Sequence, residues 1–310
     1  MWPAPEDPAV ARRMHTAHQR AQTALGVHSA HDAREAWGWR GRTLGRPVTA
    51  SDGPAWLRLA TAREGQNNPI FWNGSLDAES AIPGSVPRPR LRDHHDWNEH
   101  GWEYRAELYE RVTTPPISIS ATRMTTPNLP REWWAAARSA LDDIASVPTD
   151  RYTITQHYLD YAMPRFLGGP IETTAPSWTT AHGDFHFANL CAPTLHIIDW
   201  EGWGLAPTGY DAATLHTNSL PAPQVAARIR QELAHHLDTS AGRFAELVAI
   251  TELLHTTTRG DNLHLIQLLR QRAAHLLGRP VPCGSAEAGR PTRSLAGWLP
   301  ESDLVGGPSE

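Results

Sequence analysis

The spacing of hydrophobic and polar residues divides the chain into a front part that favours strands and a back part that favours helices. Over 102–112, tryptophan, tyrosine, alanine and leucine alternate with charged residues, a period of two that indicates a β-strand. A further strand is expected over 86–97, and alternating bulky residues within about 36–61 indicate two or three antiparallel strands. The front part is therefore expected to form a small antiparallel sheet.

Helical spacing of the apolar residues prevails after residue 130. It predicts helices over 131–145, 222–237, 242–257 and 262–277. In the front part, good helix formers over 8–25 followed by Gly26 predict another helix. Ser75 is expected to cap a short helix over 75–82, and a strand-rich island is expected over 177–199.

These elements predict an α+β protein with two lobes. We expect an N-terminal helical extension over 1–34, a small β lobe over 35–112, and a larger, mostly helical lobe over 113–279. The last of these begins with the Pro/Thr-rich connector 113–130, and the Pro/Gly/Ser-rich residues 280–310 are expected to form a flexible tail. A chain of 310 residues is long enough to bury a core in each lobe.

Composition and charge narrow the range of functions. All 28 basic residues are arginine, so chemistry that ordinarily uses lysine must use arginine or do without. The net charge of −5 argues against sequence-independent binding to nucleic acid. The negative excess lies in 113–310, where an acidic cleft would suit a cationic substrate, although surface charge commonly serves solubility alone.

The sequence also argues against a membrane-bound or secreted protein. It has no run of about 18 apolar residues, as a transmembrane helix would need. Its N-terminus lacks the basic start and apolar stretch of a secretory signal. Two cysteines are too few for a disulfide framework, so we expect a reducing, cytoplasmic environment.

The candidate chemistry lies within 178–216. This stretch contains HGDFHFAN, with Asp184 and Asn189, and then an apolar run that ends at Asp199. Phosphoryl transfer depends on positioning and on neutralising charge, and Mg²⁺ takes one or two hard oxygen ligands from the protein. A loop, two short strands and a tight turn would bring the oxygens of these three residues together.

HGDFHFAN followed by IIDWE and GYD resembles the aminoglycoside phosphotransferase family, with three elements in the family's order and spacing. The resemblance covers 178–216, is looser over 36–112, and extends to the C-terminal helices only at the level of the fold. It implies a bilobal protein-kinase-like fold. It also implies Mg²⁺-dependent transfer of the γ-phosphate of ATP or GTP to a hydroxyl of a small molecule, such as an antibiotic or another natural product.

The resemblance implies roles for five residues of this stretch. Asp184 would be the catalytic base or the residue that orients the acceptor hydroxyl. Asn189 and Asp199 would hold magnesium. Asp211, in GYD, would be a buried brace of the catalytic loop, and His182 would fix that loop by hydrogen bonding.

The β lobe departs from the kinase pattern. Kinases hold the α- and β-phosphates with a lysine on the third strand, which pairs with a glutamate on the following helix. Here Arg58 stands in that strand, and Glu79 would be its helical partner. Arginine binds phosphate through a rigid fork and is not interchangeable with lysine.

Two further nucleotide contacts are expected in this lobe. The loop over the phosphates would contain Gly38, Gly41 and Gly45, although their spacing is not the usual kinase pattern. The hinge that reads adenine through its backbone would lie over 108–111, so Leu108 and Glu110 are candidate contacts.

Simpler interpretations remain open for the single residues. An aspartate in a glycine-containing turn is commonly structural, and Glu79 could be placed only to complement a helix dipole. The three glycines could be ordinary turn residues. The adjacent pairs His94–His95 and His235–His236 lack the spacing of metal ligands and are expected to be solvated.

Other functions also remain open. His182, Asp184 and His186 would share one face of a strand and, with His196 and Asp199 nearby, could form a transition-metal hydrolase site. The missing lysine would also fit a catalytically inactive, kinase-like binding protein. Within the phosphotransferase interpretation, transfer of a nucleotide in place of a phosphate is a further alternative.

Overall fold

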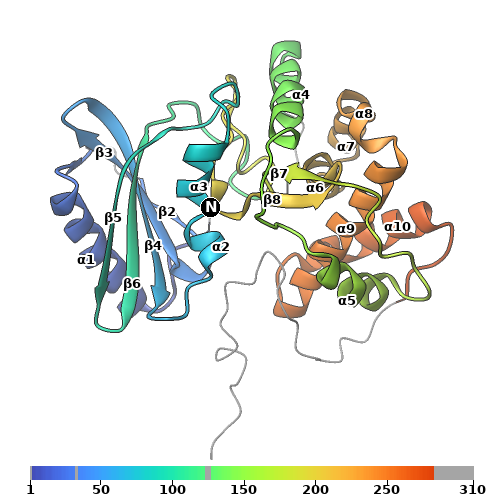
Figure 1. Ribbon diagram of the computed structural model, residues 1–310, viewed down its shortest axis with the longest axis horizontal. Coiled ribbons are helices and arrows are strands. Elements are labelled where there is room, and N and C mark those ends of the chain that lie inside the picture. The colour runs from blue at the N-terminus through green and yellow to red at the C-terminus, as the bar shows by residue number, and fades with distance from the viewer. Residues whose placement is uncertain (1, 32–33, 123–126, 283–310) are drawn as a thin grey trace, which may run out of the picture. The chain divides into compact units, whose positions relative to one another are not determined.

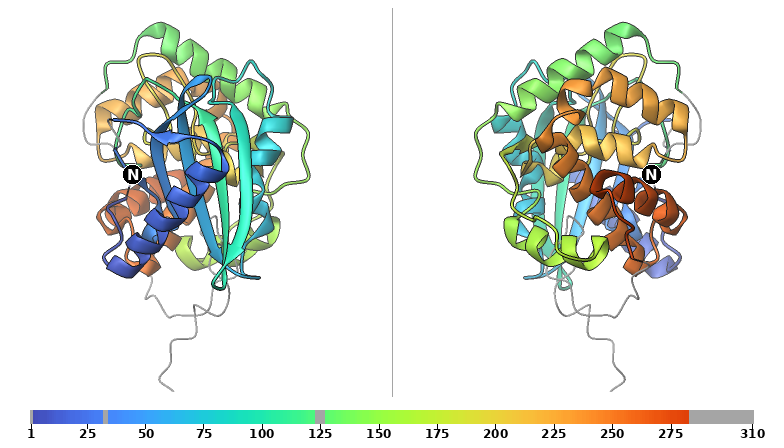
Figure 2. Two further views of the ribbon diagram at one scale, coloured as in Figure 1. Left: turned by 90° about the vertical axis from the view of Figure 1, so that its left-hand side faces the viewer. Right: turned by 90° about the vertical axis from the view of Figure 1, so that its right-hand side faces the viewer.

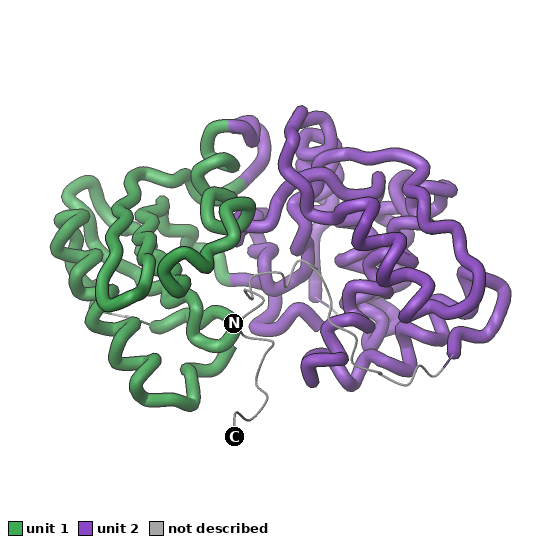
Figure 3. Tube along the Cα trace, turned by 60° about the horizontal axis from the view of Figure 1, so that its bottom comes forward, with its two compact units in different colours: residues 1–80, 88–115 green, residues 81–87, 116–310 purple. Residues whose placement is uncertain are grey.

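A computed structural model describes residues 2–31, 34–122 and 127–282 of the chain. The chain divides into two compact units, unit 1 with residues 1–80 and 88–115 and unit 2 with residues 81–87 and 116–310 (Figure 3). The expected boundary at 112/113 lies close to the change at 115/116, but the short segment 81–87 belongs to unit 2. There the Ile197 amide donates to the Pro87 carbonyl at 2.8 Å. Within the described ranges, no helix is both long and apolar enough to cross a membrane.

Unit 1 is built on an antiparallel sheet (Figure 1). Its strands are β1 (His28–Ser29), β2 (Ala36–Trp37), β3 (Thr43–Ala50), β4 (Gly53–Arg63), β5 (Leu91–Glu99) and β6 (Trp102–Glu110). They lie in the order β1–β3–β4–β6–β5, with β2 paired to β3. The strands expected from the period-two patterns are confirmed, although β5 begins at Leu91, after the prolines of 86–97.

The first helix, α1 (Pro8–Ala24), is part of the unit 1 core and not a separate extension. Asp7 caps it by accepting from the Ala9 amide at 2.8 Å. Met14, Ala17 and Ala21 form a buried stripe at helical spacing and pack with the apolar residues of the sheet. In the left view of Figure 2, α1 lies across one face of the sheet.

Two short helices precede β5, where one was expected. Asn68 and Pro69 start α2 (Pro69–Trp72), because the Asn68 side chain accepts from the Ile70 amide and proline suits the first helical position. The next helix, α3 (Gly74–Ala81), begins one residue before Ser75, so Ser75 lies inside the helix and is not its cap.

Strand β6 is buried on both faces over residues 104–108, although apolar and charged residues alternate along it. Glu107 is 1% exposed and Arg105 is 5% exposed. Arg105 donates to Asp96 on the neighbouring strand and to the Trp72 carbonyl of α2. Helix α2 thus meets the second face of the sheet, where Arg105 and Glu107 are held in ion pairs.

Unit 2 is mostly helical. Its helices are α4 (Arg131–Ala145), α5 (Gln156–Leu167), α6 (Tyr210–Asn218), α7 (Pro223–Glu232), α8 (Ala234–Leu237), α9 (Ser240–Thr256) and α10 (Ile266–Leu277). Short 3₁₀ turns occupy Trp39–Gly41 in unit 1 and Trp200–Gly202, Thr257–Arg259 and Leu263–Leu265 in unit 2. A two-stranded antiparallel ribbon joins β7 (Trp178–Ala181) to β8 (Gly204–Pro207).

The expectations for these helices are met unevenly. Helix α4 has the predicted bounds, whereas the helix expected over 222–237 is interrupted at Leu233, whose φ and ψ of −111° and 26° are not helical. Helix α6 was not expected from the sequence. Every one of its residues is buried, so it has no exposed face, and its polar and apolar residues do not separate onto two sides. The tail expected over 280–310 lies outside the described residues from 283 onward.

Candidate active site

The HGD motif begins where strand β7 ends. β7 and β8 pair from Trp178 opposite Pro207 to Ala181 opposite Gly204, and the chain between them forms a long loop. Gly183 takes a φ of +88°, and a side chain there would stand 2.9 Å from the Gly202 carbonyl oxygen. Glycine is therefore required at this position for both conformation and space.

The loop folds back on itself between Asn189 and Asp199. The Ile198 amide donates to the Asn189 carbonyl at 2.9 Å, and the Cys191 amide donates to the His196 carbonyl at 2.9 Å. A single β-bridge joins Leu190 to Ile197, where two short strands were expected. Ile198, whose amide bonds to Asn189, is followed directly by Asp199, so the fold-back brings the backbone of Asp199 near that of Asn189.

Asp184 and Asn189 are in direct contact. The Asn189 Nδ2 donates to both the Asp184 carbonyl oxygen and the Asp184 Oδ2, each at 2.9 Å. Asn189 is 7% exposed, so its amide is held in one orientation. Because Nδ2 and Oδ1 point to opposite sides of the amide, Oδ1 is directed away from Asp184.

The Asp184 carboxylate has a second partner that sequence reasoning assigned to a different role. Its Oδ1 lies 3.0 Å from the Nε2 of His186, and the aspartate side chain is half exposed. Partial burial disfavours the ionised carboxylate, but the charge of His186 outweighs that effect and lowers the pKa of Asp184 to about 2. In the same way burial would lower the pKa of His186, yet the nearby Asp184 raises it above its usual value.

His182 ties the two arms of the loop together. Its side chain is fully buried, its Nδ1 accepts from the Asp184 amide at 3.3 Å, and its Nε2 donates to the Ile198 carbonyl at 3.1 Å. Burial lowers the pKa of His182 to about 4, so the ring is neutral. The expectation that His182 fixes the loop by hydrogen bonding is therefore confirmed.

The same geometry argues against a transition-metal hydrolase site made of His182, Asp184 and His186. Strand β7 ends at Ala181, so His182, Asp184 and His186 do not share a strand face. Both ring nitrogens of His182 are already used within the protein. Among the described histidine, cysteine, aspartate and glutamate side chains, the three do not form a group with metal-ligand spacing.

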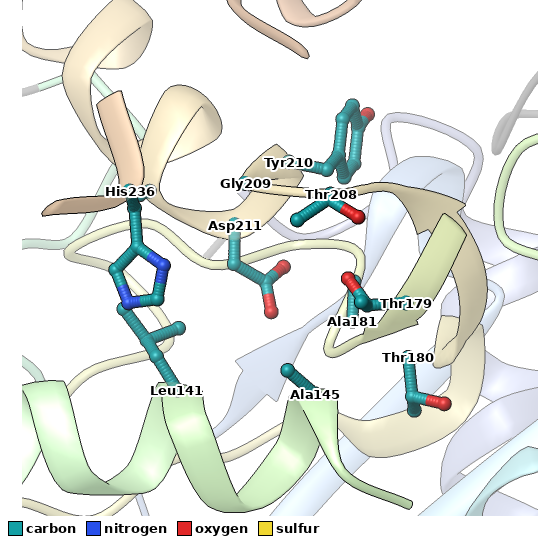
Figure 4. Close-up of a pocket in the computed structure, with 11 residues that line it drawn as sticks. Leu141, Ala145, Thr179, Thr180, Ala181, Thr208, Gly209, Tyr210, Asp211 and His236 are labelled. Atoms are coloured by element: carbon teal, nitrogen blue, oxygen red, sulfur yellow. The ribbon is translucent and has the colours of Figure 1, made fainter. Parts of the chain in front are cut away.

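Asp211 braces the HGD turn from the first turn of α6. Its Oδ2 accepts from the His182 amide at 2.7 Å and its Oδ1 accepts from the Gly183 amide at 2.9 Å. Burial raises the pKa of Asp211 to about 7, against the effect of these two backbone hydrogen bonds. Figure 4 shows its carboxylate in a small pocket beside β7. Asp211 is thus a structural residue, as the resemblance implied.

Asp199 adopts a left-handed backbone conformation, with φ of 69° and ψ of 65°. For a residue other than glycine this costs about 1–3 kcal/mol, so the surroundings must enforce it. Trp200, the next residue, donates from its indole to the Ile197 carbonyl at 2.8 Å and sets its ring edge against His182, with centroids 4.7 Å apart. The strained turn leaves the Asp199 side chain exposed at the surface of unit 2.

In unit 1, Arg58 pairs across the sheet with Glu107. The two residues are direct register partners on β4 and β6, and the Arg58 Nη1 donates to the Glu107 Oε2 at 3.0 Å. The same oxygen accepts from the Tyr109 hydroxyl at 3.0 Å. Sequence reasoning did not select Glu107, although its place opposite Arg58 in two predicted strands is a signal that strand pairing could have supplied.

The expected ion pair between Arg58 and Glu79 is wrong. Glu79 lies near the end of α3 and accepts from the Arg88 guanidinium at 2.6 Å and from the Leu91 amide at 3.0 Å. Arg90 contributes a second ion pair. The chain returning toward β5 therefore surrounds Glu79 with two arginines, and their charge keeps its pKa low in spite of partial burial.

The glycines of the expected phosphate loop have structural roles. The turn over 38–42 joins β2 to β3, and the Gly38 and Gly41 amides there donate to backbone carbonyls at 3.0 and 3.1 Å. Gly45 lies within β3 under the Trp56 ring, where an added Cβ would stand 2.6 Å from the indole. Hydrogen bonding within the turn and packing account for all three.

The two hinge candidates lie at the end of β6. The Leu108 side chain belongs to the unit 1 core and is 6% exposed. The Glu110 amide donates to the Arg90 carbonyl at 2.9 Å, and its side chain is exposed. Their part in nucleotide binding stays a prediction.

Comparison with solved structures identifies the fold. Over 89% of this chain and 99% of the other, the structure matches that of the aminoglycoside phosphotransferase APH(4)-Ia with a TM-score of 0.59 and 11% sequence identity. The chain has a protein-kinase-like fold. A thermostable mutant of APH(4)-Ia in its apo form matches 80% of this chain and 94% of its own, with a TM-score of 0.55 and 12% identity.

A structure described as a microcompartment-associated aminopropanol kinase also has this fold. It matches 85% of this chain and 96% of its own length, with a TM-score of 0.54 and 14% identity. No protein-family model matches the chain, and no curated protein matches it. At these identities the likeness establishes the fold, and the activity must be argued from the residues of the site.

Proposed function

We propose that this chain is a phosphotransferase that moves the γ-phosphate of ATP or GTP to a hydroxyl of a small molecule. The observation that carries the proposal is the fixed contact of the Asn189 amide with two oxygens of Asp184, beside a loop that folds back to Asp199. All three oxygen-bearing side chains lie on one loop of unit 2, between β7 and β8. Phosphoryl transfer needs such a set, because its catalysis consists mainly of positioning and charge neutralisation.

In this proposal Asp184 orients the acceptor hydroxyl and accepts its proton. A pKa of about 2 makes Asp184 a weak base, fully ionised at neutral pH. It therefore holds the hydroxyl by hydrogen bonding and takes the proton once bond formation to phosphorus has made the hydroxyl acidic. His186 keeps the carboxylate ionised, and Asn189 holds it in place.

Asn189 and Asp199 would hold Mg²⁺. An amide oxygen and a carboxylate are hard ligands, and one or two such protein ligands suffice when phosphate oxygens and water complete the shell. The Asn189 Oδ1 is directed away from Asp184, as a ligand position requires. Bound Mg²⁺ would supply neutralisation of the charge on the phosphates.

Arg58 would bind the phosphates of the nucleotide in place of the usual lysine. The pair with Glu107 supports this assignment, because it fixes one arm of the guanidinium on the sheet. Glu107 takes the place of Glu79 as the partner of Arg58. Leu108 and Glu110 remain candidates for the hinge through their backbone groups.

The acceptor is proposed to be a hydroxylated natural product, such as an antibiotic, and the acidic excess of residues 113–310 would favour a cationic one. A cytoplasmic location would fit a nucleoside triphosphate as co-substrate. Neither a nucleic acid nor a membrane is proposed as a partner.

The experiment incubates the purified chain with ATP or GTP, Mg²⁺ and a panel of hydroxylated antibiotics and metabolites. Mass spectrometry should find one acceptor that gains the mass of one HPO₃ group. Asp184→Asn serves as the matched control, since it keeps the size of the side chain and removes the proton acceptor. Nucleotide binding without transfer to any acceptor would favour the inactive binding protein instead, and gain of a nucleotide mass would favour nucleotide transfer.

A further inference from the structure

Helices α4 and α8 bring together two histidines and an aspartate outside the candidate active site. Asp142 lies on α4, and His235 and His236 lie on α8. One possible ligand atom from each of the three lies within 4.8 Å of the other two. Among the described residues this is the one group of such side chains with metal-ligand spacing.

The distance between His236 and Asp142 matches the coordination geometry of zinc. The His236 Nε2 lies 3.5 Å from the Asp142 Oδ1, and the two imidazole rings have centroids 4.1 Å apart. In a tetrahedral site with bonds of about 2.0–2.2 Å, neighbouring ligand atoms stand roughly 3.3–3.5 Å apart. The His236–Asp142 pair already has this spacing. The exposed His235 offers a ligand atom within 4.8 Å of the other two and would have to turn toward them.

The His236 Nε2 also lacks a hydrogen bond where it needs one. The atom is buried, and no described residue forms a hydrogen bond with it. Its contact with the Asp142 carboxylate at 3.5 Å is no hydrogen bond, and a metal ion held between the two groups would satisfy both. The imidazole and the Asp211 carboxylate line the same small pocket, with Leu141 of α4 beside them (Figure 4).

We propose that Asp142, His235 and His236 form a binding site for a divalent transition-metal ion of the zinc class. Two imidazole nitrogens and one carboxylate oxygen form a ligand set that suits zinc, with water in the fourth position. Mg²⁺ prefers oxygen ligands alone, so this site and the proposed magnesium site differ in chemistry. The metal would join α4 to α8 next to the pocket that holds the Asp211 brace. Its binding would not depend on the proposed phosphotransfer.

The expectation that His235 and His236 are merely solvated followed from sequence spacing alone. Two adjacent histidines rarely suffice as ligands, and their third partner lies on a helix far away in the sequence. The pair His94–His95 provides a comparison. These residues are neighbours on strand β5, so their side chains point to opposite faces of the sheet.

The test is calorimetric titration of the full chain with Zn²⁺, after removal of bound metal by a chelator and with excess Mg²⁺ present throughout. Asp142→Asn and His235→Ala should each weaken zinc binding at least tenfold. Both residues are exposed, so these changes should leave the fold intact, which circular dichroism would verify. His94→Ala removes one member of a histidine pair outside the site and should leave zinc affinity unchanged.

A second readout is thermal unfolding with and without Zn²⁺. A ligand that binds only the folded state raises its stability, so Zn²⁺ should raise the Tm of the wild-type chain more than that of Asp142→Asn. The proposal is overturned if the wild-type chain binds no zinc at millimolar concentration. It is equally overturned if Asp142→Asn binds zinc as tightly as wild type, or if His94→Ala loses as much affinity as His235→Ala. Because no nucleotide or acceptor is used, these results are independent of whether phosphotransfer is found.

Discussion

Glu107→Gln removes a negative charge from the interior of unit 1 and leaves the size of the side chain unchanged. Glu107 is 1% exposed, and its Oε2 accepts from Arg58 and from Tyr109, each at 3.0 Å. Removing one partner of a buried ion pair costs about 3–5 kcal/mol, because the other charge stays in a low-dielectric environment. The Arg58 side chain is 16% exposed and is partly solvated. We therefore expect a loss at the lower end of that range, about 3 kcal/mol in the free energy of unfolding.

Urea unfolding followed by circular dichroism measures this loss. Arg58→Met and the double variant complete a double-mutant cycle, in which the double variant should lose less stability than the sum of the single ones. Glu64→Gln is the matched control. Glu64 is exposed at the end of β4, accepts from the Asn98 side chain, and should change stability by no more than about 0.5 kcal/mol.

The functional part of this prediction concerns nucleotide binding. If Glu107 holds Arg58 in place for the phosphates, Glu107→Gln should raise the KM for nucleotide more than it lowers kcat. The measurement must be made where circular dichroism shows the variant to be folded. A Glu107→Gln chain within about 0.5 kcal/mol of wild type, with additive cycle energies, would refute the reasoning about this pair.

Asp184→Asn should abolish turnover and largely preserve nucleotide binding; steady-state turnover within tenfold of wild type would remove its assigned role. Asp199→Ala should lose magnesium-dependent nucleotide binding, and an unchanged calorimetric affinity would contradict the metal role. His186→Gln should raise the pKa of Asp184 from about 2 toward its ordinary value, so activity should fail at a higher pH on acidification than in wild type. An acidic limb of the pH–rate profile that does not move would show that His186 does not set this pKa. Glu246→Gln should destabilise unit 2 by about 3–5 kcal/mol, because Glu246 is fully buried and accepts from Arg272 at 2.6 and 2.8 Å. Its pKa is lowered to about 2, so this stabilisation is present above the pKa of the unfolded chain and is lost as the pH falls through about 2. Equal urea midpoints for wild type and Glu246→Gln at neutral pH would contradict it.

The loop to which we assign catalysis could be predicted from the sequence because its parts are local. Asp184 and Asn189 lie five residues apart, so neighbouring residues largely decide their contact, and a short fold-back returns the chain to Asp199. The strands of unit 1 and helix α4 were predictable for a related reason. Each of these elements buries one face in a core, and the apolar residues of that face recur at the spacing of a strand or a helix in the sequence.

The partners of individual side chains could not be predicted in this way. The kinase pattern favours Glu79 as the partner of Arg58, whereas strand register places Glu107 opposite Arg58 and the chain after α3 places Arg88 beside Glu79. Helix α6 gave no signal because it is buried on all sides. The contact of His236 with Asp142 depends on how α4 packs near α8, and the sequence of neither helix indicates that packing.

The sequence by itself determined the kinds of element, their order along the chain and the residues of the proposed catalytic loop. These depend on backbone preferences and on burial of one face, and both act over a few consecutive residues. The tertiary structure alone decided which charges pair, which polar groups are buried and where a second metal site could form. Those outcomes depend on distances of a few ångströms between segments far apart in the chain, and only the packing of the folded units sets such distances.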